Sequence, residues 1–168
     1  IGFEPSDESI EAKNKGLEIV NDYYHHDYLY PIEADMIILR QVLEHLPDPL
    51  NFIKSFSENL LSRTGEGLLY IEVPNSKKTR NLSRFPDFYY EHYTYFTIKS
   101  LVFMMESCGF DVIEVKEDFN GEVISALMIR SNTSHDKNLL EEARSNAKEN
   151  IEGMLSCNQD IVGWGAAG

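Results

Sequence analysis

Side chains able to move protons are concentrated in residues 85–97, which read FPDFYYEHYTYFT. The stretch contains four tyrosines, three phenylalanines, Glu91 and His92. A neutral imidazole, with an ordinary pKa near ~6.5, can accept a proton at neutral pH, and a neighbouring carboxylate can orient the ring or raise its basicity. Tyrosine hydroxyls can donate hydrogen bonds to an oxyanion that forms during a reaction. The composition predicts either a base-catalysed site at His92 or a hydrophobic lid that carries one surface histidine.

Polar side chains also follow the first two predicted strands. Glu4 comes directly after the apolar start of the chain, and Asn21 and Asp22 come after LEIV. A carboxylate at a strand tip can accept hydrogen bonds from both hydroxyls of a ribose, so Glu4 is a candidate for nucleotide binding. The alternative is a solvated turn carboxylate. Asn21 and Asp22 could meet an adenine edge or, equally, cap a turn.

Two further histidine positions invite a chemical reading. His45 lies in LRQVLEHLPDP, where the chain packs back toward the next helix. We interpret it as structural, with a catalytic role as the alternative. His25 and His26 are adjacent, and adjacent histidines usually do not converge on one ion. Because no second pair of ligands is spaced to help, we predict no metal site.

Hydrophobic patterns predict an alternation of strands and helices that would position these residues. Strands are expected at IGF, LEIV, ADMIILRQV, GLLYIEV, DVIEV and VISALMI. The continuous run from Met36 to Leu39 suits a strand that is covered on both faces. Helices are expected over residues 6–16, 48–65, 101–109 and 136–155, and a long functional loop is expected over residues 75–97.

This order of elements predicts an open α/β sheet, mostly parallel, whose last hairpin supplies an antiparallel edge strand. In such sheets ligands bind beyond the carboxyl ends of the strands. Glu4, Asn21, His45 and the 85–97 stretch all follow predicted strands. The sequence therefore predicts that they lie at one edge of the sheet.

Composition excludes several classes of function. The chain has 168 residues and a formal net charge of −13, which argues against surfaces that bind nucleic acid or anionic membranes. No apolar run reaches the length of a membrane span. The two distant cysteines, Cys108 and Cys157, are typical of a reduced, cytoplasmic setting. Because the chain starts on Ile1 and stops within a glycine motif, we expect it to be a piece of a longer protein.

That glycine motif is IVGWGAAG, in which Gly163, Gly165 and Gly168 spell G-x-G-x-x-G. The pattern is typical of dinucleotide binding when a helix and, about 20 residues later, an acidic residue follow it. Neither can be checked in this sequence. An NAD-dependent oxidoreductase whose cofactor domain begins at Asp160 therefore stays open as an alternative.

Six stretches taken in order resemble the class I S-adenosylmethionine-dependent methyltransferases, and most of all the sugar C-methyltransferases. They are GFEPS, IILRQVLEHLPDPLNFI, LLYIEVPN, FPDFYYEHYTYFT, SLVFMMESCGF and IVGWGAAG. Enzymes of that family methylate C3 of nucleotide-linked 4-keto deoxysugars. The resemblance implies a Rossmann-like sheet truncated at both ends. It also implies a partial methyltransferase domain (1–134), a connecting helix (135–159) and the start of a C-terminal Rossmann-like domain (160–168).

The resemblance implies roles for individual residues as well. In the aromatic stretch, His92 would be the base that removes the C3 proton, with Glu91 and Tyr89 beside it. The cofactor would contact the ends of three strands: its ribose at Glu4, its adenine at Asn21 and Asp22, and its methionine end at the backbone of Leu39, Arg40 and Gln41.

The family's glycine-rich loop and N-terminal zinc-binding region would precede Ile1. We therefore expect this piece by itself to be inactive, and any zinc to lie in that preceding region. The expected substrate is a nucleotide-linked keto-sugar. The alternatives are another class I O- or N-methyltransferase, which would not need the Glu91–His92 pair, the NAD-dependent oxidoreductase, and a catalytically inactive scaffold.

Overall fold

The computed structural model describes residues 1–24, 36–61, 67–88 and 91–131. Three groups of sequence predictions lie outside these residues: the paired histidines at 25 and 26, Tyr89, and everything after residue 131. The last group comprises the expected helix at 136–155, the domain boundaries near 134 and 159, and the glycine motif.

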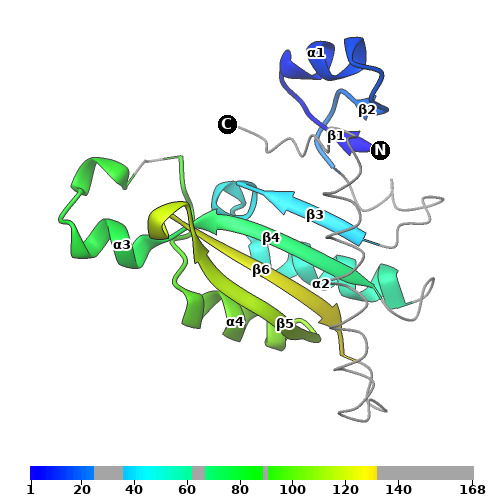
Figure 1. Cartoon of the computed structure of the whole chain (residues 1–168). Coiled ribbons are helices and arrows are strands. Elements are labelled where there is room, and N and C mark those ends of the chain that lie inside the picture. Colours follow the sequence, from blue (N-terminus) through cyan, green and yellow to red (C-terminus); the bar gives the residue numbers. More distant parts are fainter. Residues whose placement is uncertain (25–35, 62–66, 89–90, 132–168) are drawn as a thin grey trace.

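The larger sheet has four strands in the order β3-β4-β6-β5 (Figure 1). Strands β3 and β4 are parallel, and β6 runs antiparallel to both of its neighbours. The α/β fold class predicted from the sequence is confirmed. The strands are β3 (Met36–Arg40), β4 (Leu68–Pro74), β5 (Phe110–Asp118) and β6 (Val123–Arg130).

The last hairpin, formed by β5 and β6, lies at the edge of this sheet as predicted, and its edge strand is paired antiparallel. Strand β6 pairs with β4 on one side and with β5 on the other, so β5 is the edge strand. Residues 124–130 of β6 are all buried. A strand buried along its length needs hydrogen-bonding partners on both edges, because unpaired backbone groups away from water are costly.

Helices α2 (Pro49–Leu61) and α4 (Ile98–Ser107) pack against one face of the sheet (Figure 1). Alternate residues of β4 and β6 point into the core beneath them, as the period of two of a strand requires. The side chains in this core include Ile53, Phe56, Leu69, Ile71, Val73, Leu101, Met105, Ala126 and Met128.

The opposite face of the sheet is less covered. Ile113, Leu127 and Ile129 form a smaller cluster there, with partly buried side chains from β3 and β4 around it. Ile38, in the middle of β3, is 45% exposed. Within the described residues, the expectation that the run from Met36 to Leu39 is covered on both faces is therefore wrong, since Ile38 lies on the face opposite the core that holds Leu39.

A side-chain cap starts α2 where the sequence predicted, whereas α4 starts at Ile98, before the predicted start at residue 101. The Asp48 carboxylate accepts the backbone N–H of Asn51 (3.1 Å) at the start of α2. Thr97 and Ser100 form a reciprocal capping box at the start of α4. Gly109, with φ of +81°, ends α4 in the left-handed conformation that favours glycine.

A second, two-stranded parallel sheet is formed by β1 (Gly2–Phe3) and β2 (Ile19–Val20), joined by helix α1 (Glu8–Asn14). The ring of Tyr24, just after β2, packs 5.2 Å from Phe3 and 5.0 Å from Phe56 of α2, measured between ring centroids. This aromatic contact connects the small sheet to the core of the larger one.

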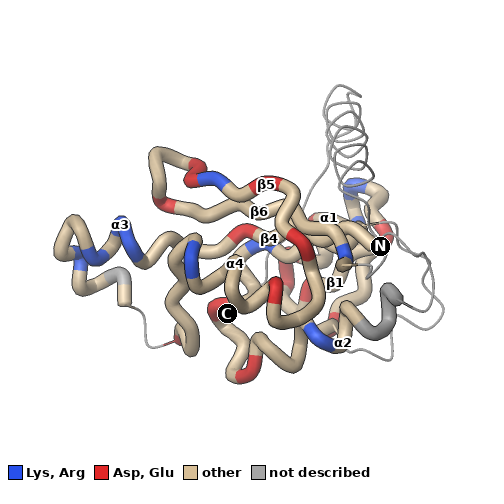
Figure 2. The backbone as a smooth tube through the Cα atoms, turned by 90° about the horizontal axis from the view of Figure 1, so that it is seen from below, with Lys and Arg blue, Asp and Glu red and all other residues tan. Residues whose placement is uncertain are grey.

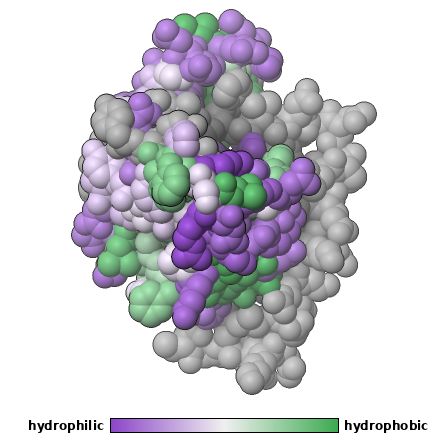
Figure 3. Space-filling model, turned by 90° about the vertical axis from the view of Figure 1, so that its left-hand side faces the viewer, coloured by the Kyte–Doolittle hydropathy of each residue, from purple (hydrophilic) through white to green (hydrophobic). Residues whose placement is uncertain are grey.

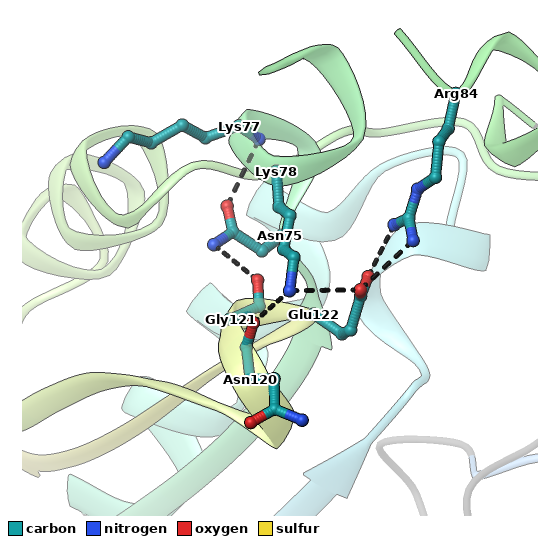
Figure 4. A network of polar contacts seen from close by, with 7 residues as sticks. All are labelled: Asn75, Lys77, Lys78, Arg84, Asn120, Gly121 and Glu122. Atoms are coloured by element: carbon teal, nitrogen blue, oxygen red, sulfur yellow. Dashed lines mark hydrogen bonds and ion pairs between the residues drawn. The ribbon is translucent and has the colours of Figure 1, made fainter. Parts of the chain in front are cut away.

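The predicted loop at 75–97 contains helical structure. It includes α3 (Ser76–Asn81) and a 3₁₀ turn, η3 (Phe85–Asp87). Asn75 caps α3 by accepting the backbone N–H of Lys77 (3.2 Å), and it donates to the carbonyl of Gly121 (3.0 Å) (Figure 4). The stretch thus leaves the sheet at the end of β4, and its first residue is bonded to the β5–β6 turn.

Candidate active site

Two segments distant in sequence meet just beyond the carboxyl end of β3. The 3₁₀ turn η2 (Leu43–His45) follows β3, and the segment after residue 90 returns to it. The carbonyl of Glu44 accepts backbone hydrogen bonds from Tyr93 (2.8 Å) and Thr94 (3.3 Å). These bonds bring the rings of His45 and His92 together edge to face, with centroids 4.7 Å apart.

His92 is a partly buried imidazole. Burial, and next the nearby His45, lower its pKa below the usual histidine value, while Glu91 acts in the opposite direction. Glu91 thus raises the pKa of His92, as expected, but burial lowers this pKa by more, so the net shift is downward. The consequence is a ring that is neutral at physiological pH, which is the form that can accept a proton.

Glu44 lies behind the histidine pair. Its side chain is buried, with a relative exposure of 2%, and its Oε1 is 4.0 Å from Nε2 of His45. Its Oε2 has no hydrogen-bond partner in the described part of the chain. Burial raises the pKa of this carboxyl group to about 7. Glu44 therefore exchanges protons in the same pH range as an imidazole.

Glu44, His45 and His92 each offer one metal-ligating atom, and these atoms lie within 4.8 Å of one another. Two ligands of one tetrahedral zinc ion, each about 2.0–2.2 Å from the metal, are roughly 3.4 Å apart. The Glu44–His45 separation of 4.0 Å exceeds this value. The spacing therefore suits proton exchange better than metal coordination.

The residues after the first two strands lie together at one edge. The backbone N–H of Glu4 donates to the carbonyl of Val20 (3.0 Å), and the Asn21 amide donates to the carbonyls of Glu4 (3.0 Å) and Ser6 (3.2 Å). The Glu4 carboxylate is buried and accepts the backbone N–H of Ser6 (2.8 Å). Asp22 accepts the backbone N–H next to it, so Asn21 and Asp22 take part in turn capping, the alternative that the sequence left open.

At the end of β3, the side chains of Leu39 and Arg40 contact other parts of the protein. Leu39 is buried in the core, and Arg40 Nε is 2.7 Å from Glu72 Oε2. Gln41 has φ of +54°, and its N–H donates to the carbonyl of Glu72 (2.9 Å). This left-handed residue turns the chain sharply away from the sheet. The contact of the backbone at 39–41 with the cofactor, which the resemblance implied, stays a prediction.

Comparison with known proteins decides the class of this site. Residues 1–115 match the family model described as a methyltransferase domain. The chain belongs to this methyltransferase family. Among solved structures, the domain resembles a methyltransferase in complex with the Haloferax volcanii Trm112 activator (TM-score 0.58, 12% identity, 80% of this chain and 72% of that one). It also resembles a methyltransferase of Bacillus halodurans (TM-score 0.54, 12% identity, 77% and 82%).

Among curated proteins, the methyltransferase domain is similar to the C-methyltransferase NovU of Streptomyces niveus. The two are 24% identical over an alignment of 160 residues, and the match covers 79% of this chain and 37% of that protein. The chain thus spans little more than a third of this relative. These similarities place it among the class I S-adenosylmethionine-dependent methyltransferases and favour that class over an NAD-dependent oxidoreductase.

The strand ends of this methyltransferase fit S-adenosylmethionine in chemical character. Glu4 has a buried carboxylate, fixed in orientation by the hydrogen bond that it accepts from the N–H of Ser6. Asn21 directly follows the adjacent strand β2, and Gln41 turns the chain at the end of β3. None of the helices in the described ranges has the length and hydrophobicity needed to cross a bilayer.

Sequence reasoning predicted His92 as the base, interpreted His45 as structural with a catalytic role as the alternative, and gave the Glu44 side chain no role. The available signal was position, because both residues directly follow a strand whose carboxyl end is expected to hold ligands. Tyr89 lies outside the described residues. Tyr95 has its ring centroid 5.9 Å from that of His92, so this tyrosine contributes to the described site.

Proposed function

We propose that this chain is part of a C-methyltransferase that methylates C3 of a nucleotide-linked 4-keto deoxysugar. The observation that carries the proposal is the edge-to-face pair of His45 and His92 at the carboxyl end of β3. A base is needed to methylate a carbon next to a ketone, whereas transfer to an amine or hydroxyl makes a weaker demand. The similarity to NovU, a C-methyltransferase, points in the same direction.

In this reaction His92 accepts the proton from C3 of the sugar. The electron pair of the broken C–H bond moves toward C4, and negative charge develops on the C4 oxygen. A tyrosine hydroxyl stabilises that oxygen by donating a hydrogen bond, and Tyr95 and Tyr89 are the candidates for this donor. Glu91, beside His92 in the chain, favours the protonated imidazole once the proton has moved.

S-adenosylmethionine supplies the electrophilic methyl group that the C3 carbanion accepts. In this proposal Glu4 holds its ribose, Asn21 and Asp22 lie by its adenine, and the backbone of residues 39–41 lines its methionine end. The chain's task in the transfer is orientation, because an in-line displacement depends on how the two reacting atoms are held.

The test is methyl transfer by the full-length protein with a panel of nucleotide-linked 4-keto sugars, together with hydroxyl and amine acceptors. His92→Asn is expected to lower transfer to the sugar by about a hundredfold or more, since general-base catalysis has that magnitude. Its affinity for S-adenosylmethionine should stay within about twofold, because His92 is assigned to the substrate. Tyr93→Phe, at an exposed position next to His92, is the matched control.

Three results would overturn the proposal. They are transfer by His92→Asn at the wild-type rate, methylation by the wild type of the hydroxyl or amine acceptors alone, and failure of the full-length protein to bind S-adenosylmethionine. The first result would show that His92 is not the base, the second that the acceptor is not a carbon atom, and the third that S-adenosylmethionine is not the cofactor.

A further inference from the structure

The buried carboxyl group of Glu44 has no task in the reaction described above. We propose that the proton which His92 takes from the substrate is relayed through His45 to the carboxylate of Glu44. Glu44 does not touch the substrate and acts through His45, as a positioning residue. This inference rests on the proposed function, because it needs His92 to be the base.

The geometry of the three side chains supports a relay. Oε1 of Glu44 is 4.0 Å from Nε2 of His45, and the rings of His45 and His92 have centroids 4.7 Å apart. One ring nitrogen of each histidine and one carboxylate oxygen of Glu44 lie within 4.8 Å of one another, which is more than a direct hydrogen bond. That distance is suited to a small rotation of one side chain or to a single bridging water, and both allow a proton to pass.

Burial of Glu44 gives the relay an end point. Its side chain is 2% exposed, and its Oε2 has no hydrogen-bond partner in the described residues. An ionised carboxylate in such a place lacks the hydrogen bonds that would stabilise its charge, so it gains by taking up a proton. Because the pKa of Glu44 is raised to about 7, its proton affinity is close to that of an imidazole, and transfer between the two groups is nearly balanced in energy.

The charged groups around the relay do not replace Glu44 as its acceptor. On the segment after residue 90, Glu91 acts on His92, but its side chain is exposed. On the neighbouring strands, Arg40 and Glu72 form an ion pair with each other. Tyr95, whose ring packs near His92, offers a hydroxyl and not a carboxylate.

The proton balance of the relay closes. The C3–H bond breaks, its electron pair stays on the substrate, and the proton goes to one ring nitrogen of His92. The proton on the other nitrogen of His92 passes to His45, and a proton of His45 passes to the Glu44 carboxylate. Both imidazoles end neutral, and one negative charge has moved from Glu44 to the C4 oxygen. The His45 side chain is 23% exposed, so it can return the proton to solvent after turnover.

The main chain of Glu44 makes this residue a good target for substitution. The segment that carries His92 is attached to Glu44 through its backbone carbonyl, which accepts the N–H groups of Tyr93 and Thr94. A change of side chain leaves these two bonds in place. Glu44→Gln also keeps the size of the side chain while removing its ability to accept a proton.

The deciding experiment measures exchange of the C3 proton for deuterium. Full-length protein is mixed in D₂O with S-adenosylhomocysteine and the 4-keto sugar nucleotide that the wild type methylates, and exchange is followed by NMR as a function of pH. Glu44→Gln is expected to slow exchange about tenfold or more and to remove one ionisation from the pH profile. Glu44→Asp should recover part of the rate, and Glu114→Gln, at an exposed carboxylate of β5, should behave as the wild type.

The outcomes separate this proposal from the function on which it rests. If the wild type does not exchange the C3 proton, the proposed function fails and the relay fails with it. If the wild type exchanges and Glu44→Gln matches it in rate, or is slower with an unchanged pH profile, the relay alone is overturned. Should Glu44→Gln not fold, His45→Asn interrupts the same relay, and an unaltered pH profile in that variant would overturn it.

Discussion

The carboxyl group of Glu44 links the stability of the protein to its proposed chemistry. A buried carboxylate is destabilising when it is ionised, because the protein replaces few of the hydrogen bonds that water would make to it. Proteins tolerate such groups where a raised pKa is useful, and active sites are the usual place. Glu44, with its pKa raised to about 7 and two imidazoles in front of it, has this character.

Substitution of Glu44 by Gln should therefore change how stability depends on pH. The pKa of Glu44 is 4.5 when unfolded and about 7 when folded, so the folded state binds more protons between these values. The stabilisation is fully present below pH 4.5 and is lost as the pH rises through 7, a loss of about 3 kcal/mol. In urea unfolding, the free energy of unfolding of Glu44→Gln should rise relative to that of the wild type by up to that amount between pH 5 and pH 8. Parallel pH curves for the two proteins would show that Glu44 is not protonated in the folded state.

At the residue scale, the sequence could predict His92 but not its partner. The stretch FYYEHYTYFT marks His92 by its own composition, whereas His45 lies far away in the chain. What joins the two is the pair of backbone hydrogen bonds to the carbonyl of Glu44. Every residue has a carbonyl, so no residue type could have signalled this contact.

Among the elements, α3 and the turn between β5 and β6 depend on each other through Glu122. The Glu122 carboxylate pairs with Arg84 and with Lys78 (3.2 Å), and Lys78 also donates to the carbonyl of Asn120 (Figure 4). The turn itself contains Phe119 and Asn120 with positive φ, a conformation that non-glycine residues seldom adopt. These contacts therefore stabilise both α3, which is polar, and the turn between β5 and β6, which is strained.

Glu122→Gln is expected to loosen the α3–η3 excursion without unfolding the sheet. Hydrogen bonding by Arg84, and then the other contacts, lower the pKa of Glu122. Its stabilisation is thus present above pH 4.5 and is lost as the pH falls through the lowered folded value. Limited proteolysis at residues 82–88 should be faster in Glu122→Gln than in wild type at pH 7, and the difference should shrink below pH 4 and in high salt. Equal cleavage rates at pH 7, with Glu114→Gln as the control, would contradict this role.

At the element scale, the sequence patterns indicated which segments would be buried, but not which strands would pair with each other. The apolar run before Pro74 predicted β4, and the spacing of Leu101, Met104 and Met105 predicted α4. The residues of β6 are as apolar as those of a parallel strand, so their pattern does not reveal that β6 inserts between β4 and β5. Helix α3, with the sequence SKKTRN, has no apolar face, and only the Asn75 cap could have indicated it.

For the molecule as a whole, charge is distributed unevenly. The net charge is −13, yet α3 carries Lys77, Lys78 and Arg80 and no acidic residue (Figure 2). The side of the molecule on which β3 and β4 end mixes hydrophobic and hydrophilic residues (Figure 3). Several exposed aromatic side chains, including Phe85, Phe88 and Tyr95, come from the segment between α3 and α4. Such a surface suits a substrate with both anionic and planar parts, as a nucleotide-linked sugar has.

The two sheets divide the proposed tasks, and this division makes a prediction for the whole molecule. Glu4, beside the two-stranded sheet, is assigned to the cofactor, while His92 lies at the carboxyl end of the larger sheet and is assigned to the substrate proton. Glu4→Gln keeps an oxygen that can accept the backbone N–H of Ser6, so the turn should persist while the charge is lost. A hydrogen bond to a charged group contributes roughly 1.5–3 kcal/mol, so affinity for S-adenosylmethionine should fall about tenfold or more.

The same Glu4→Gln protein should exchange the C3 proton at a rate within about twofold of wild type when no cofactor is present, because His92 and its partners are untouched. Calorimetric titration of the full-length protein measures the first effect and NMR exchange the second, with Glu18→Gln, at an exposed carboxylate next to β2, as the matched control. His92→Asn should show the reverse pattern, with binding kept and exchange lost. If either variant lost both properties while remaining folded, the two sites would be one functional unit, and the division between the sheets would be wrong.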